Sequence, residues 1–210
     1  SRRRDSKDGE ELLYIEDFDG LAALVQLGVV EVHIWGSTIE ALETPDQIIF
    51  DLDPDEGLAI EDVQKATLAI RGRLEELGMP SLVKTSGGKG FHVAVPLKPK
   101  ADWDRVKAFA HDFAKAMEQA EPDRYTATLS KSARKGRIFI DYLRNGRGST
   151  TVVAYSSRGN PDGTVSMPIE WDMVAKTVPA AFRIGEPTAR KKVEKLDSWQ
   201  DFFKQGFLLR

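Results

Sequence analysis

The sequence predicts an α+β protein in which helices flank a mixed or antiparallel β-sheet. Short apolar runs of strand length, such as residues 47–53 and 91–95, occur between long stretches with helical periodicity, such as residues 103–120. These elements interleave without strict βαβ repetition, which disfavours an all-parallel sheet. A chain of 210 residues, 41% of them hydrophobic, can bury a sizeable core, and we expect residues 1–210 to form a single domain.

The first elements are short. Residues 1–10 are expected to lie in a surface loop. Residues 21–27 are predicted to be helical and to end at Gly28, because glycine readily takes the C′ position of a helix. Residues 30–35 alternate apolar and polar side chains, which predicts a strand with His33 on its polar face.

The middle of the chain gives the clearest patterns. Residues 47–53 form a predicted buried strand, which the turn residues 54–57 terminate. Residues 60–77 have helical spacing. Two further strands, residues 81–84 and 91–95, are then joined by a glycine-rich turn.

The last part of the chain is predicted to continue the same pattern. It should hold a long helix (103–120), two strands (138–142 and 151–155), a helical stretch beginning at Trp171, a charged segment (189–195) and a short terminal helix (199–208). There is no internal repeat and no low-complexity tract.

Composition excludes several functional classes. The sequence has no cysteine, so disulfides, thiolate nucleophiles and cysteine-based zinc sites are ruled out. No stretch approaches the ~20 apolar residues that a membrane span requires. The start of the chain lacks the apolar region of a secretory signal, and the cytoplasm is the expected compartment. The net charge of -3 disfavours non-specific coating of nucleic acid, although basic residues cluster on both sides of Asp141.

Acidic residues end two of the predicted strands. Asp51 and Asp53 follow the run 48–50, and Asp141 follows residues 137–140. Because side chains alternate along a strand, Asp51 and Asp53 share a face, and Asp141 joins them if its strand is a neighbour. Carboxylates this close repel one another, and Mg²⁺ or Mn²⁺ would relieve the repulsion, as in enzymes that displace phosphate esters with two metals. The alternative is that each aspartate caps a turn.

The glycine-rich turn, residues 85–90, is the second motif. Its glycines allow backbone N–H groups to turn toward an anion. Ser86 adds a hydroxyl donor, Lys84 or Lys89 adds positive charge, and His92 can donate to a phosphate oxygen. It is not a P-loop, because the spacing differs and a strand follows instead of a helix. The alternative is an ordinary glycine-rich hairpin.

Residues 141–148 form the third motif. Asp141 is followed closely by Arg144, and Arg158 leaves another predicted strand. A carboxylate beside guanidinium groups suits a metal next to a polyphosphate, because arginine binds phosphate oxygens bidentately. The alternative is a surface ion pair of little energetic value.

Taken together, these stretches resemble one family. The segments HIWGS, FDLDP, VKTSGGKGFHVAVPL, KSARKGRIFIDYLRNGRGSTTVVAYSSR and VSMPIEWD resemble the polymerase domain of bacterial DNA ligase D, a member of the archaeo-eukaryotic primase superfamily. The resemblance runs from about Asp17 to Trp171. It implies an RRM-like catalytic core, two divalent ions (Mn²⁺ or Mg²⁺), and addition of nucleotides, preferentially ribonucleotides, to DNA 3′ ends in non-homologous end joining.

The resemblance also assigns roles by position in the motifs. Asp51, Asp53 and Asp141 match the metal-binding acids, and His33 matches a catalytic histidine near the primer terminus. For His33 the alternative is a core histidine satisfied by the backbone.

The residues that match nucleotide contacts form a second set. Ser86 and His92 match residues that hold the triphosphate, and Arg144 and Arg158 match basic residues at the nucleotide and its phosphates. Lys89 is a further expected phosphate contact.

The implied partners are a nucleoside triphosphate, a DNA primer–template or DNA ends, ligase and nuclease domains of a parent protein, and a Ku-type end-binding protein. No membrane partner is expected, and the protein would associate with the bacterial nucleoid when bound to DNA. The family domain has a longer N-terminal segment, which is not visible in this chain. Two other functions stay open: a DNA-end-binding module without full catalytic activity, and a metal-dependent nuclease that shares the acid triplet.

Overall fold

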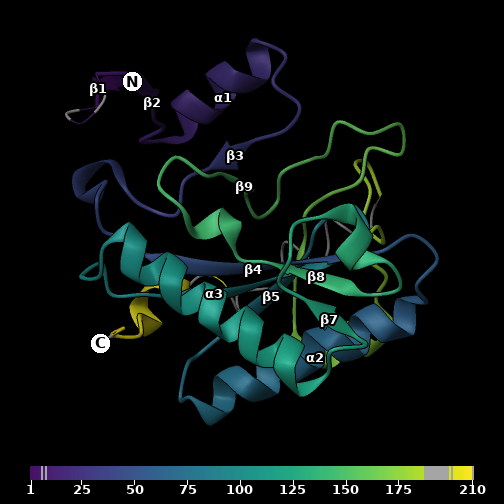
Figure 1. The fold of residues 1–210 in the computed structure, drawn as a ribbon. Helices are drawn as coiled ribbons and strands as arrows, with labels where there is room; N and C mark the ends of the chain where they lie inside the picture. Colours follow the sequence, from purple (N-terminus) through teal and green to yellow (C-terminus); the bar gives the residue numbers. More distant parts are fainter. Residues whose placement is uncertain (6, 8, 187–198, 200, 210) are drawn as a thin grey trace.

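A six-stranded sheet forms the centre of the computed structural model, which describes residues 1–5, 7, 9–186, 199 and 201–209 (Figure 1). In sheet order the strands are β10 (Pro168–Ile169), β5 (Leu82–Thr85), β6 (Phe91–Pro96), β4 (Gln47–Pro54), β8 (Ile138–Asp141) and β7 (Tyr125–Thr126). Each neighbouring pair is antiparallel except β7 and β8, which are parallel. The predicted mixed sheet is therefore confirmed.

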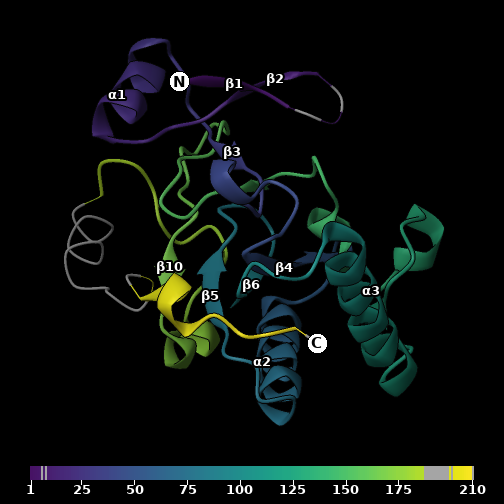
Figure 2. The ribbon, with the colours of Figure 1, turned by 90° about the vertical axis from the view of Figure 1, so that its left-hand side faces the viewer.

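Two long helices, α2 (Ile60–Glu76) and α3 (Trp103–Ala120), cover one face of this sheet (Figures 1 and 2). Alternation along β4 directs Ile48, Phe50 and Leu52 into the core beneath these helices, and all three are almost fully buried. Apolar side chains at helical spacing complete this core, namely Ala66, Ile70 and Leu74 from α2 and Val106, Ala110, Phe113 and Met117 from α3.

The opposite face of the sheet lies under a different kind of structure. A two-stranded ribbon, β3 (His33–Ile34) paired with β9 (Thr151–Val152), lies on this side in Figure 1. Farther out are the hairpin β1 (Arg2–Arg4) and β2 (Glu11–Leu13), and helix α1 (Phe18–Gln26).

The hairpin is tied to the rest of the molecule through Arg147. Its guanidinium Nη2 lies 2.6 Å from Asp5 Oδ2 and 2.9 Å from Glu43 Oε1. Its charged group also lies over the Trp35 ring, 5.4 Å from the ring centroid. Arg147 therefore joins the hairpin to the body, which is a structural role.

The described residues also form short 3₁₀ turns: η1 (Ile39–Ala41), η2 (Lys131–Arg134), η3 (Leu143–Asn145), η4 (Trp171–Lys176) and η5 (Phe202–Gln205). In η5, Phe202 packs against Ile49 and Ala94. Within the described residues, none of the helices combines the length and the apolar character needed to cross a bilayer.

Several sequence predictions need correction at the ends of the chain. Within the predicted surface loop 1–10, Arg2–Arg4 form a strand that pairs with β2 in a hairpin. The helical stretch expected from Trp171 is only the 3₁₀ turn η4, because Thr177 is extended and Pro179 follows shortly after. The predicted terminal helix at 199–208 is reduced to η5, and the charged segment 189–195 lies outside the described residues.

Two predicted strands are shorter than expected. In the segment 30–35 only His33–Ile34 is a strand, because Val32 N donates to the side-chain hydroxyl of Ser156 instead of a backbone carbonyl. The predicted strand 151–155 ends after Val152, and Tyr155 adopts a φ of 69°, which a strand does not accommodate.

Candidate functional site

Asp51 and Asp141 face each other across the β4–β8 ladder. They are directly paired in the antiparallel register, so their side chains lie on the same face of the sheet, away from α2 and α3. Arg144, in the turn η3 just after β8, lies between them: its Nε is 3.1 Å from Asp141 Oδ2 and 3.6 Å from Asp51 Oδ2. The predicted convergence of these two carboxylates is thus present in the structure.

The two carboxylates have different electrostatic surroundings. Burial raises the pKa of a carboxyl group, but the charges around Asp51, with His92 and Arg144 foremost, outweigh burial and lower its pKa to about 2. The pKa of Asp141 is raised, mainly by burial and further by the charge of Asp51, although Arg144 opposes the shift. Repulsion between neighbouring carboxylates, expected from the sequence, therefore acts at Asp141.

Asp53 lies two residues farther along β4, on the same face. Its carboxylate accepts a 2.6 Å hydrogen bond from Arg134 Nη1. The Arg134 guanidinium lies over the ring of Phe139, 3.9 Å from the ring centroid, and Phe139 is the residue opposite Asp53 in β8. Asp53 is thus paired with an arginine of its own, separate from Arg144.

The donors present are of the type that a hard divalent cation takes. The carboxylates of Asp51, Asp53 and Asp141, on two neighbouring strands, supply only oxygen ligands, as Mg²⁺ and Mn²⁺ prefer. In the present arrangement, however, Arg144 and Arg134 neutralise them, and among the described residues no three histidine or acidic side chains are close enough to form a metal centre as they stand. The donor atoms of these carboxylates are suited to a divalent cation. Binding an ion would require Arg144 to release Asp51 and Asp141.

A buried polar chain extends from Asp51 across the sheet. His92, opposite Asp51 in β6, places its Nε2 3.2 Å from Asp51 Oδ1. Its other ring nitrogen is 3.0 Å from Lys84 Nζ, and Lys84 in turn donates to Ser166 Oγ at 2.8 Å. Burial lowers the pKa of Lys84 to about 7 and also lowers the pKa of His92, although the charge of Asp51 opposes both shifts.

The glycine-rich turn packs tightly against β4, and its backbone N–H groups donate to other atoms of the protein. Ser86 Oγ accepts from the N–H groups of Gly88 at 3.0 Å and Gly90 at 3.3 Å, and Gly87 N donates to Pro179 O at 3.1 Å. The prediction that these glycine N–H groups turn toward an anion is therefore wrong for this structure. Because Ser86 Oγ accepts both bonds, its own O–H proton is still available to donate to a ligand.

Close contact explains two of these glycines. A Cβ at Gly90 would lie 1.8 Å from the carbonyl oxygen of Leu52 in β4, which backbone cannot accommodate. Gly87 has a φ of +70°, and a Cβ there would lie 2.6 Å from Arg158 Cγ. The turn is thereby held against both the acid-bearing strand and Arg158.

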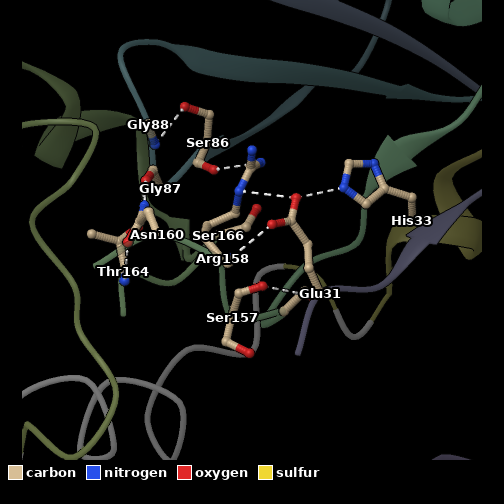
Figure 3. A network of polar contacts seen from close by, with 12 residues as sticks. Glu31, His33, Ser86, Gly87, Gly88, Ser157, Arg158, Asn160, Thr164 and Ser166 are labelled. Atoms are coloured by element: carbon tan, nitrogen blue, oxygen red, sulfur yellow. Dashed lines mark hydrogen bonds and ion pairs between the residues drawn. The ribbon is translucent and has the colours of Figure 1, made fainter. Parts of the chain in front are cut away.

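Figure 3 shows how Arg158 and His33 are linked near this turn. Arg158 Nη1 donates to Ser86 O at 3.1 Å, and its Nε lies 3.2 Å from Glu31 Oε1. The same oxygen of Glu31 lies 2.5 Å from His33 Nε2. The His33 side chain is 40% exposed and bonded to a carboxylate, so the alternative of a core histidine satisfied by the backbone is wrong.

The expected phosphate contact at Lys89 is not brought to this cluster. Lys89 Nζ pairs with Glu56 Oε1 at 3.2 Å on the surface, where both side chains are largely exposed. Within the described part of the chain, no hydrogen bond or ion pair joins Lys89 to Asp51 or Asp141.

Two polar partners were missed by sequence reasoning. Glu31 lies two residues before His33, and this spacing on an extended segment is the one local signal that could have identified it. Ser166, the partner of Lys84, lies 82 residues farther along the chain and carries no local signal at all.

Comparison with known families defines the class of protein: residues 1–199 match the model described as "LigD, primase-polymerase domain", so the fold is that of a primase-polymerase domain. The chain belongs to the LigD primase-polymerase family.

Individual relatives agree with this assignment. The chain is 42% identical over 158 residues to the multifunctional non-homologous end joining protein LigD of Pseudomonas aeruginosa, covering 75% of this chain and 19% of that protein. It is 32% identical over 185 residues to the protein of the same description from Mycolicibacterium smegmatis, covering 87% of this chain and 24% of that protein. The chain thus spans about a fifth to a quarter of the length of these relatives.

A solved structure agrees with the fold. The polymerase domain of Mycobacterium tuberculosis ligase D, in complex with DNA, superposes with a TM-score of 0.86 at 27% sequence identity. The match covers 99% of this chain and 75% of that chain. The α+β fold expected from the sequence is therefore confirmed.

Proposed function

We propose that this chain transfers nucleotides from nucleoside triphosphates onto DNA 3′ ends, filling gaps and processing ends during non-homologous end joining. The observation that carries the proposal is the pairing of Asp51 and Asp141 across β4 and β8, with His92 and Arg144 in contact with these carboxylates. The names of the relatives, which are end-joining proteins, and the DNA in the related solved structure support the same substrate class.

In this proposal the acids of β4 and β8 hold the divalent ions. Asp51, Asp53 and Asp141 are the ligands, and the ions, Mn²⁺ or Mg²⁺, supply activation of the primer hydroxyl and neutralisation of charge on the phosphates. Asp51 is well suited to this role because its lowered pKa of about 2 keeps it ionised at neutral pH.

The remaining polar residues bind and orient the triphosphate. Arg158 and Arg144 offer guanidinium donors, and Ser86 has a hydroxyl proton to donate. His92, held between Asp51 and Lys84, would contact the triphosphate beside these acids. These groups stabilise charge and do not transfer protons. His33, partly exposed, would orient the 3′ hydroxyl of the primer.

The wider setting is also part of the proposal. Because the chain spans only a fraction of its relatives, we propose that it acts together with ligase and nuclease domains of a parent protein and with a Ku-type end-binding protein. Lys89 remains a proposed phosphate contact, which would require its release from Glu56.

A primer-extension assay tests the proposal. The purified chain is incubated with a labelled primer–template, one nucleoside triphosphate and Mn²⁺, and products are resolved by length while pyrophosphate is measured. We expect an elongated primer with equimolar pyrophosphate, and loss of both in Asp51→Asn. A shortened primer would indicate a nuclease, and binding of DNA without either product would indicate an end-binding module; both results would contradict the proposal.

A further inference from the structure

The Glu31 carboxylate links Arg158 and His33, the side chains proposed to contact the nucleotide and the primer. Glu31 Oε1 lies 2.5 Å from His33 Nε2 and 3.2 Å from Arg158 Nε, and Glu31 Oε2 accepts from the N–H of Gly159 at 2.8 Å (Figure 3). The carboxylate therefore has a partner on each oxygen and fixes two side chains from different segments of the chain. An ionised carboxylate only accepts hydrogen bonds, so the proton lies on Nε2 of His33.

Several contacts hold Arg158 in place, and Glu31 supplies the charged partner among them. The backbone N of Arg158 donates to Thr164 O at 2.8 Å, its Nη1 donates to Ser86 O at 3.1 Å, and its Cγ lies against Gly87. Guanidinium has five N–H donors, and these contacts use only part of them. The rest of the planar group is thereby presented in a fixed direction, as bidentate recognition of a phosphate requires.

We propose that Glu31 is a positioning residue that holds Arg158 and His33 in a fixed relation, so that the nucleotide phosphates and the primer end are oriented together. The inference rests on the proposed function and adds to it a residue that touches neither substrate.

The physical reason is preorganisation. A free arginine side chain populates many rotamers, and ordering it upon binding a ligand costs free energy. Burial raises the pKa of Glu31, but the Gly159 N–H and the adjacent His33 and Arg158 outweigh burial and lower it. The Glu31 carboxylate is consequently available as an anion, and it orders Arg158 before a nucleotide arrives.

The kinetic test uses Glu31→Gln, which keeps the size of the side chain and removes its charge. We expect KM for the nucleoside triphosphate to rise about tenfold, the loss typical of one charge-assisted hydrogen bond that is partly exposed to solvent. We also expect kcat to fall, because the neutral amide is a weaker acceptor for His33 Nε2–H than the carboxylate.

Double-mutant cycles test whether Glu31 acts through these two side chains. In an Arg158→Ala background, Glu31→Gln should raise KM no further, and in a His33→Ala background it should lower kcat no further. Ser157→Ala is the matched control, because Ser157 Oγ donates to Val30 O on the same segment without touching the carboxylate. This control should leave both constants within about twofold of the wild-type values.

A measurement without substrate separates this inference from the proposed function. In protein labelled with ¹⁵N-arginine, exchange of the Arg158 Nε–H with water should be at least about tenfold faster in Glu31→Gln than in the wild type or Ser157→Ala. If the wild type extends no primer but this exchange changes as expected, the proposed function fails and the linkage stands. Unchanged exchange, an unchanged or lowered KM, or fully additive effects would each overturn the inference.

Discussion

The two faces of the six-stranded sheet are built from the same strands but differ in chemistry near the ends of β4 and β8. On β4, Ile48, Phe50 and Leu52 enter the apolar core beneath α2 and α3. The alternate positions Asp51 and Asp53 face the opposite side, where arginines neutralise them. A period of two residues thus separates a face that stabilises the fold from a face that carries charge.

This difference shows why the charged face can be tolerated at all. Asp51, His92 and Lys84 are costly to bury singly, but each is bonded to the next across neighbouring strands. The helix-covered face supplies the free energy that keeps these strands in register. We therefore expect substitutions on the two faces to have separable effects, on stability for one and on activity for the other.

The largest effect is expected on the charged face at Asp51. Asp51→Asn should reduce nucleotide addition by about a thousandfold or more, about 4 kcal/mol in the activation free energy, because the remaining acids cannot hold the ions alone. Primer extension measures this, with circular dichroism to show that the fold is retained. Asp112→Asn on the exposed surface of α3 is the control and should be fully active. Near-normal extension by Asp51→Asn would place the site elsewhere.

On the helix-covered face the opposite pattern is expected. Ile48→Ala, at a position with no solvent exposure, should lower the free energy of unfolding by about 3 kcal/mol, because it removes buried methylene groups and leaves a cavity. Urea denaturation measures the loss. Well below its melting temperature the variant should retain nucleotide addition within about threefold of the wild-type rate. A collapse of activity in the folded variant would show that the two faces are not separable.

Asp46, just before β4, provides a pH-dependent comparison with Asp51. Burial raises the pKa of Asp46 to about 6, and its Oδ1 is buried without a hydrogen-bond partner among the described residues. The pKa of Asp46 in the folded state lies above its unfolded value near 4. Its contribution to the free energy of unfolding is therefore most favourable below pH 4 and is lost as the pH rises through 6. At pH 7 the loss amounts to about 3 kcal/mol.

Unfolding free energies of the wild type and Asp46→Asn, measured from pH 4 to pH 8, test this assignment. The stability of Asp46→Asn relative to the wild type should increase across this range and level off above pH 7. A difference that stays constant with pH would contradict the assignment.

The smallest effect is expected at Arg158. Arg158→Ala should raise KM for the nucleotide about tenfold, about 1.4 kcal/mol, with less change in kcat, because Arg158 contributes to binding more than to chemistry. Steady-state kinetics at varied nucleotide concentration measure the shift. Arg183→Ala, which removes an exposed arginine paired with Asp162, should leave KM unchanged. A change confined to kcat would assign Arg158 a different role.

Local patterns predicted much of the fold. The bounds of α3 and the position of β4 follow directly from periodicity, and alternation within β4 predicted that Asp51 and Asp53 share a face. The two-residue strands β7 and β10 were missed, because two residues are too few to show a period.

The candidate site was predictable only in part. The pairing of Asp51 with Asp141 was anticipated, but the contacts of Lys84 with Ser166 and of Glu31 with Arg158 join segments far apart in the sequence. Such contacts depend on the tertiary fold and leave no local signature. The same holds for the glycine-rich turn, whose N–H groups are used by Ser86 and by Pro179.

A crystal structure of the chain with Mn²⁺ and a non-hydrolysable nucleoside triphosphate tests the central claim most directly. We expect an anomalous manganese peak between the carboxylates of Asp51 and Asp141, with Arg144 withdrawn from between them and the phosphates against His92 and Arg158. A nucleotide bound without manganese at Asp51, or with its phosphates on another surface, would contradict the assignment of this face as the site of nucleotidyl transfer.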